Sequence, residues 1–331
     1  MVDFTAVGRT GTPFRLDLER GKIREFARAT RSDNPAYWRD ERPVVPPTFL
    51  TTQMFWQEWA GPDADPWHHV RLDQRRGMHA EQEYVFAGPP PRAGTTLTGL
   101  SRIGEIYQKA GRRGGTLTFA TMVTEFRDPD GGLVAEARMT GVETARPPQD
   151  DGRASLSQGT DTPAPVPAAS PQAASSQAAS SQAAAQALAP ASGPEPGPWS
   201  SPPPPPPLVV GPLTRTDFVR YQGASGDMNP LHHDEPFAQR AGYEAPLAIG
   251  MFNAGLLATY ATDWLGAVAV RGFRIRFREQ AWPGDILTCT GLVLREYEAD
   301  GEPRVDVELA CVRRAGGVAV QAWATFTREN A

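Results

Sequence analysis

The 331-residue sequence contains very little lysine and no excess of positive charge. Only Lys22 and Lys109 are lysines, so arginine supplies nearly all of the 33 basic side chains, against 38 acidic ones. The first 145 residues carry 19 basic and 19 acidic residues, and no later segment is basic either. A nucleic-acid-binding domain requires a clustered basic surface. We therefore expect no nucleic-acid partner.

Cysteine and histidine are also scarce. The two cysteines, Cys289 and Cys311, lie in segments that alternate like strands, and the N-terminus shows no charged-then-apolar leader. This pattern favours a reduced, cytoplasmic location. His68, His69 and His79 lack a metal-binding spacing such as two histidines four positions apart with a third ligand. We expect no metal site.

Long hydrophobic runs are absent, with one partial exception at residues 247–270. This segment has a single charge, Asp263, but also polar residues, several glycines and a helix-breaking point at 264–266. A membrane helix needs about 20 predominantly apolar residues with interfacial flanks. The run instead predicts a helix buried inside a sheet, and no membrane association.

Proline, in contrast, is abundant, and its placement divides the chain. Sixteen of the 33 prolines lie in residues 146–207, together with QAASS repeats and six consecutive prolines at 202–207. Such a composition buries too little apolar surface to offset its ordering entropy. We predict a disordered linker at 146–207, ending in a stiff polyproline II spacer, between domains at 1–145 and 208–331.

The two domains repeat one pattern. At an offset of 195 residues, an amphipathic helix that runs into Asn34-Pro35 corresponds to one that runs into Asn229-Pro230. A proline-led apolar segment follows at 46–50 and at 246–250, and the first copy reaches it about five residues sooner. Alternating strands come next. Each copy predicts an α+β unit in which a small helix and a long buried helix are followed by an antiparallel sheet that wraps the long helix.

Two motifs in the second copy identify a resemblance. Residues 226–234 read GDMNPLHHD, and residues 246–251 read PLAIGM. Together they resemble the signature of MaoC-like, R-specific enoyl-CoA hydratases and 3-hydroxyacyl-thioester dehydratases of the hotdog fold. The first copy resembles the companion N-terminal domain, whose catalytic residues are typically degenerate. The resemblance implies a double hotdog that interconverts (R)-3-hydroxyacyl and trans-2-enoyl thioesters in fatty-acyl, polyketide or sterol side-chain metabolism.

Carried onto this chain, the motif implies a specific set of site residues. Asp227 and His232 are the acid-base pair, and their individual protons stay unassigned because coupled groups share them. Pro230 prevents a continuous helix and lets both side chains face one site. Asn229 would orient the water, and the Gly250 backbone N–H, at a helix N-terminus, would stabilise the thioester oxyanion. Substrate contacts are expected at Gly226 and Met251. Where the family commonly has histidine, this chain has Ile249.

The first copy lacks the acid-base pair. Ser32 and Tyr37 take the places of Asp227 and His232, and neither titrates near neutral pH. We therefore predict one active site per chain. The aromatic helix of this half, with Phe49, Met54, Phe55, Trp56 and Trp59, is either a receptor for a long acyl tail or ordinary core packing.

The substrate would carry its own cofactor, because coenzyme A or the phosphopantetheine of an acyl carrier protein holds the acyl group. No other cofactor is expected. Hotdog units usually pair; here the two halves can do so within one chain, and a homodimer of the whole chain is compatible with the same fold. Two rival functions share the fold, namely an acyl-CoA thioesterase and a non-catalytic acyl-thioester-binding subunit. The second is favoured if Asp227 and His232 lie far apart.

Overall fold

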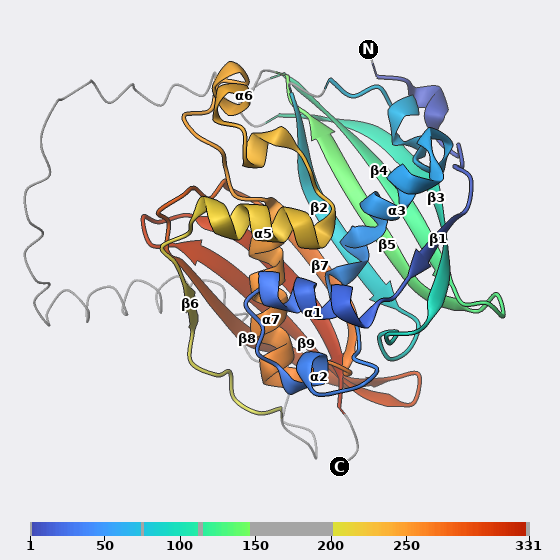
Figure 1. Cartoon of the computed structure of the whole chain (residues 1–331), viewed down its shortest axis with the longest axis vertical. Helices are drawn as coiled ribbons and strands as arrows, with labels where there is room; N and C mark the ends of the chain where they lie inside the picture. Colours follow the sequence, from blue (N-terminus) through green and yellow to red (C-terminus); the bar gives the residue numbers. More distant parts are fainter. Residues whose placement is uncertain (1, 74–75, 112–114, 146–200, 329–331) are drawn as a thin grey trace, which may run out of the picture.

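The computed structural model describes residues 2–73, 76–111, 115–145 and 201–328. Most of the predicted linker, residues 146–200, lies outside this described part. Ten strands form one antiparallel sheet in the order β1-β3-β4-β5-β2-β7-β10-β9-β8-β6 (Figure 1). Helices cover one face of each half.

The elements of the N-terminal half are η1 (Phe4–Ala6), β1 (Phe14–Asp17), α1 (Arg20–Ala29), α2 (Pro35–Trp38), η2 (Phe49–Thr52), α3 (Gln53–Ala60), η3 (Pro62–Ala64), η4 (Pro66–His69), β2 (Gly77–Phe86), β3 (Thr96–Ala110), β4 (Thr116–Arg127) and β5 (Leu133–Glu143). Those of the C-terminal half are β6 (Leu208–Val210), α5 (Arg215–Ser225), η5 (Pro230–His232), α6 (Glu235–Arg240), α7 (Gly250–Leu265), β7 (Val270–Phe277), β8 (Leu287–Ala299), β9 (Glu302–Arg313) and β10 (Val318–Thr327). The η elements are 3-10 helices.

The two halves are related by an approximate two-fold axis. Read inward from either edge, the strands follow the same sequence of connections until β2 and β7 meet as antiparallel neighbours, with Tyr84 opposite Phe273. Corresponding turns also match, since Gly131 and Gly316 both adopt a positive φ between paired strands. The predicted repeat and the double-hotdog fold are confirmed.

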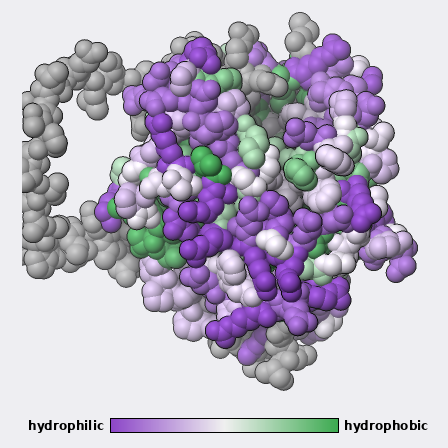
Figure 2. All heavy atoms as spheres, in the orientation of Figure 1, coloured by the Kyte–Doolittle hydropathy of each residue, from purple (hydrophilic) through white to green (hydrophobic). Residues whose placement is uncertain are grey.

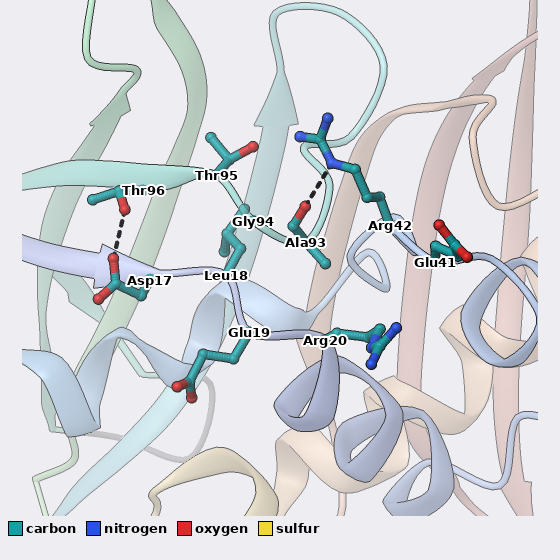
Figure 3. Close-up of a pocket in the computed structure, with 10 residues that line it drawn as sticks. All are labelled: Asp17, Leu18, Glu19, Arg20, Glu41, Arg42, Ala93, Gly94, Thr95 and Thr96. Atoms are coloured by element: carbon teal, nitrogen blue, oxygen red, sulfur yellow. Dashed lines mark hydrogen bonds between the residues drawn. The ribbon is translucent and has the colours of Figure 1, made fainter.

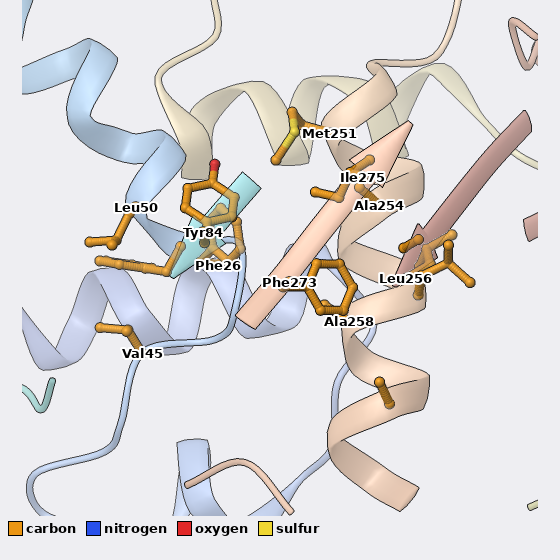
Figure 4. Packing of buried hydrophobic residues seen from close by; sticks show 14 of the residues in the cluster. Phe26, Val45, Leu50, Tyr84, Met251, Ala254, Leu256, Ala258, Phe273 and Ile275 are labelled. Atoms are coloured by element: carbon orange, nitrogen blue, oxygen red, sulfur yellow. The ribbon is translucent and has the colours of Figure 1, made fainter. Parts of the chain in front are cut away.

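Helix α7 is the central helix of the C-terminal half and is almost entirely buried, as the sequence predicts for this run. It ends at the predicted break, where Gly266 adopts a φ of 95°. Within the described ranges, no helix is both long enough and apolar enough to cross a membrane. The core around α7 continues across the β2–β7 seam, where Phe273 and Ile275 of β7 lie between the two halves (Figure 4).

The expected long buried helix of the N-terminal half is wrong. In its place stand η2 and the eight-residue α3. Helix α3 buries Gln53 and Gln57, while the apolar residues Met54, Phe55 and Trp59 are exposed, the last to 82%. Gln57 Nε2 donates to Ser101 Oγ at 3.0 Å, so the sheet beneath α3 is partly polar. Core packing therefore does not account for these three apolar side chains.

Two other segments bear on the predicted boundaries. The extra residues of the second copy form α6, which has no counterpart in the first. The last part of the predicted linker, 201–207, is not a free spacer. Trp264 Nε1 donates to the carbonyl of Pro202 at 2.8 Å, and the Tyr260 hydroxyl donates to that of Pro205 at 3.0 Å. The proline segment is therefore bound to the end of α7 before it enters β6.

Candidate active site

The first part of the candidate site is the loop that follows α5. This helix starts with a capping box, in which Thr214 and Asp217 satisfy each other's backbone amides. It ends at Gly226, whose φ of 84° is left-handed and therefore suits glycine. A side chain at Gly226 would also meet Phe55 of α3, because an ideal Cβ would lie 3.0 Å from the Phe55 Cβ. Gly226 thus sets the direction in which the loop leaves the helix and lets α3 approach it.

Gln222 fixes the path of this loop, and the sequence analysis missed it. Its buried Nε2 donates to the carbonyls of Asp227 at 2.8 Å and Asn229 at 3.1 Å. Its Oε1 lies 3.0 Å from Nδ1 of the exposed His233. The available signal was a glutamine four residues after the buried Phe218, on the core-facing side of α5.

Asp227 and Asn229 shape the turn with their own side chains. The Asn229 N–H donates to Asp227 Oδ1 at 3.2 Å, and Asn229 Oδ1 accepts from the Leu231 N–H at 3.1 Å, which caps η5. Asp227 is half-buried and Asn229 is exposed. The Asn229 oxygen thus serves as the cap of η5, and the predicted water-orienting role of this residue stays a prediction.

His232 sits at the end of η5 and is 8% exposed. Its Nδ1 lies 2.9 Å from the carbonyl of Leu247. A carbonyl only accepts, so Nδ1 carries the hydrogen and Nε2 of the neutral ring is left as an acceptor. Burial lowers the pKa of His232, and the Asp227 carboxylate opposes that change. Both predicted acid-base residues lie in the short segment between the end of α5 and the end of η5.

The second part of the site is the start of α7. Leu247 is bonded to the loop, since its N–H also donates to the carbonyl of Leu231 at 3.2 Å, and the chain then enters α7 at Gly250. The N-cap Ile249 makes no side-chain hydrogen bond, and its carbonyl accepts from the Phe252 N–H at 3.0 Å, so donor capacity is left to the amides of Gly250 and Met251. Met251 is 5% exposed and packs in the core, and its expected contact with the substrate stays a prediction.

A residue of the N-terminal half also lies close to the start of α7. His79, at the start of β2, contacts Phe277 in a tilted arrangement, with ring centroids 4.7 Å apart and an interplanar angle of 51°. Phe277 in turn covers Gly250, since a Cβ at that glycine would lie 2.9 Å from Phe277 Cδ1. The charge of Asp227 also acts on His79. The sequence analysis considered His79 only as a metal ligand.

Comparisons with known proteins agree with this arrangement. A family model described as "FAS1-like, dehydratase domain region" matches residues 5–137, and one described as "MaoC like domain" matches residues 205–310. The chain belongs to the MaoC-like dehydratase family. The second match contains the α5–η5 loop and the start of α7.

Individual members of the family cover the chain to different extents. Over 120 residues the chain is 37% identical to a UPF0336 protein of Streptomyces coelicolor, and the aligned region covers 33% of this chain and 77% of that protein. Over 66 residues it is 41% identical to the enoyl-CoA hydratase ChsH3 of Mycobacterium tuberculosis. That aligned region covers 19% of this chain and only 23% of the hydratase. A solved structure titled "MaoC-like dehydratase" aligns with a TM-score of 0.70 at 20% identity, covering 98% of this chain and 99% of that one. At that identity the structural likeness shows the fold.

In the N-terminal half of this MaoC-like chain, the corresponding loop is closed. Ser32 and Tyr37 are 2% and 1% exposed. Asn34 Nδ2 donates to Asp263 Oδ1, in the last turn of α7, at 2.9 Å. Of the matching positions in the C-terminal half, Asp227 is half-buried and Asn229 is exposed, while His232, at the position of Tyr37, is 8% exposed. The two loops thus have similar backbone conformations but differ in how far solvent reaches their side chains.

A separate cavity of about 520 Å³ opens in the N-terminal half between α1 and the loop before β3 (Figure 3). Its lining mixes carboxylates with arginines, and two of them are already engaged: Asp17 accepts from Thr96, and Arg42 donates to the carbonyl of Ala93. It contains no histidine or cysteine. In the described part of the chain, no cluster of three histidine, cysteine or acidic side chains is arranged for a metal ion.

Proposed function

We propose that the chain is a hydro-lyase that interconverts (R)-3-hydroxyacyl thioesters and trans-2-enoyl thioesters at one site in its C-terminal half. The observation that carries the proposal is the assembly of an accessible carboxylate and a neutral, oriented imidazole beside an uncapped helix N-terminus. Asp227 and His232 supply the first two, and Gly250 begins the helix. The name of the hydratase relative agrees with this reaction.

Each part of the site would meet one need of the reaction. Water must be activated at C3 and a proton handled at C2, and two titratable groups can each contribute roughly 10²- to 10⁴-fold. His232, with Nε2 unprotonated, is ready to accept a proton. Negative charge that develops on the thioester oxygen would be met by the Gly250 N–H and the positive end of the α7 dipole. The chemistry needs no metal or redox cofactor.

The acyl tail would lie along α3. Met54, Phe55 and Trp59 are exposed to 44%, 51% and 82%. Phe55 contacts Gly226, directly beside the catalytic loop. Figure 2 shows apolar side chains over α3 on a face that is otherwise largely hydrophilic. An apolar row that starts at the reacting atoms suits a long or bulky acyl group, carried by coenzyme A or by an acyl carrier protein.

The test is an assay of purified protein with trans-2-enoyl-CoAs of increasing chain length. Loss of the conjugated enoyl absorbance reports hydration, and a thiol reagent reports thioester hydrolysis. We expect hydration without thiol release, and a loss of at least 10²-fold in kcat/KM for Asp227→Asn and for His232→Ala. The matched control is Ser32→Ala, at the position of Asp227 in the other half, which should retain most of the activity.

The rival functions give different results. A thioesterase would release thiol without consuming the double bond. A non-catalytic subunit would bind enoyl-CoA with no turnover, and both catalytic-residue variants would bind it as tightly as the original chain does. Unchanged hydration rates in both variants would remove the proposed site.

A further inference from the structure

One edge of the ten-stranded sheet is formed by β8 together with the three-residue strand β6 (Figure 1). We infer that the proline segment 202–207 closes this edge, and that its docking on α7 keeps β8 from pairing with a second copy of the chain. This role is independent of the proposed reaction, because it belongs to the end of α7 opposite Gly250. The sequence of β8, the register of the segment and its bonds to α7 all support it.

The edge that needs a cover is an uncharged stretch of β8. Residues 286–294 read ILTCTGLVL, without a charge or a proline. In the described part of the chain, β6 pairs only with Leu287, Thr288 and Cys289, so residues 290–299 have no strand on that side. Uncharged, proline-free stretches with high strand propensity at a sheet edge are templates for pairing with other chains. An uncovered β8 would therefore associate.

The proline segment lies along this open edge. Leu208 of β6 lies opposite Cys289, and the same register continued backwards places Ser201 opposite Glu296. The hydrogen bonds agree with this register, because the Ser201 N–H donates to the Glu296 carboxylate. The six prolines between Ser201 and β6 therefore run beside residues 290–295 of β8.

Proline suits a segment that terminates a sheet. Its ring fixes φ and removes the backbone N–H, so six consecutive prolines form a polyproline II helix that offers no donor to a further strand. This helix has three residues per turn, so carbonyls three positions apart face the same side. The carbonyls of Pro202 and Pro205 have this spacing, and both are bonded to α7.

Two aromatic residues of α7 hold these carbonyls. Trp264 Nε1 donates to Pro202 at 2.8 Å, and the Tyr260 hydroxyl donates to Pro205 at 3.0 Å. The two rings are one helical turn apart, with centroids 6.3 Å from each other. Gly291 of β8 makes room for both, since a Cβ there would lie 3.0 Å from Trp264 Cζ3 and 3.1 Å from Tyr260 Cε1. Aromatic-lined grooves of this kind bind polyproline II segments, and here the ligand is the chain's own segment.

The first test replaces prolines 202–207 by alternating glycine and serine in the full chain, which keeps the length but restores backbone donors and flexibility. At the micromolar concentrations where exposed edges associate, the mean mass by light scattering should at least double relative to the original chain. Adding Leu292→Lys should restore the original mass, because Leu292 lies in the covered stretch, opposite Glu308, and an edge lysine opposes pairing. An unchanged mass in the glycine-serine variant would overturn the inference, and so would association that Leu292→Lys leaves intact.

The second test keeps every proline and removes both donors with Tyr260→Phe and Trp264→Phe, which retain aromatic rings. Hydrogen exchange in residues 286–294 should become about tenfold faster, since each bond changes an opening equilibrium by roughly two- to tenfold. The matched control is Tyr297→Phe, which removes a hydroxyl of β8 that donates to Asp306 Oδ1 at 3.2 Å and should leave this exchange unchanged. Original exchange rates in the double variant would refute the docking role, even if the glycine-serine variant failed to fold.

Discussion

Substitution of Gly250 by proline, compared with alanine, isolates the proposed oxyanion donor. Proline removes the backbone N–H and alanine keeps it, and both add the same Cβ. Gly250 is the first residue of α7, a position where proline is well tolerated because its fixed φ suits the helix. The preceding Ile249 has φ −66° and ψ 126°, a conformation that a residue before proline readily adopts. The pair of variants therefore differs in the N–H and in the ring carbons Cγ and Cδ that replace it in proline.

The steric cost is common to both variants. An added Cβ would lie 2.9 Å from Cδ1 and 3.0 Å from Cε1 of Phe277, so that half-buried ring must move by a few tenths of an ångström. Crowding of this kind costs about 1 to 3 kcal/mol of folding free energy. The loss of an oxyanion donor costs about 10²- to 10³-fold in rate. We expect kcat/KM to fall by that factor between Gly250→Ala and Gly250→Pro.

The assay is enoyl-CoA hydration at fixed pH, with melting temperatures measured by circular dichroism. The two variants should melt within a few degrees of each other, which separates a catalytic loss from unfolding. Equal values of kcat/KM in two folded variants would refute the assignment of the oxyanion donor to Gly250. A large loss already present in Gly250→Ala would instead show that displacement of Phe277 disturbs the site.

Three further predictions concern stability. Asp217→Ala removes a buried carboxylate that accepts from Thr214 and binds Arg31 and Arg220. Urea unfolding should show that the free energy of unfolding falls by about 3 kcal/mol or more. A fall below about 1 kcal/mol would contradict a role of Asp217 in holding the two halves together. Burial lowers the pKa of His232, so the unfolded chain binds more protons than the folded one just below pH 6.5. The free energy of unfolding should therefore fall as the pH drops through that range. His232→Gln should reduce this pH dependence, and an unchanged pH dependence would argue against a buried neutral ring. Gly255→Ala places a Cβ 2.4 Å from Thr30 Cγ2 and should cost about 1 to 3 kcal/mol, whereas Gly223→Ala, in open space on α5, should be neutral or stabilising by thermal unfolding.

The repeat, the family and the buried helix could be predicted because their signals are local or periodic. Strand alternation and glycine turns recur at fixed offsets, and turn glycines such as Gly131 and Gly316 keep the same left-handed conformation in both halves. The turn of the candidate loop at residues 226–232 could be predicted for the same reason. Its geometry is set by side chains bonded to neighbouring amides, as when Asp227 and Asn229 each accept from the residue two positions on.

The features that escaped prediction depend on contacts between distant segments. The apolar pattern of α3 predicts burial, but the short helix turns its glutamines inward because Ser101 and Thr124 make the sheet beneath it polar. His79 changes face because of one extra residue, Ala80, which no sequence period reveals. The proline segment is bound by Tyr260 and Trp264, which lie more than fifty residues further along the chain.

The length of the central helix explains why only one half keeps an accessible site. Helix α7 has sixteen residues, and its last turn brings Asp263 against Asn34, which closes the N-terminal loop over Ser32 and Tyr37. Helix α3 has eight residues and ends at Ala60, and its Phe55 lies against Gly226, while Asp227 and Asn229 of the loop in the C-terminal half still reach solvent. Loss of the acid-base pair in the first half is therefore matched by loss of access. Restoring a carboxylate and an imidazole there would not create a second site unless α7 were also shortened.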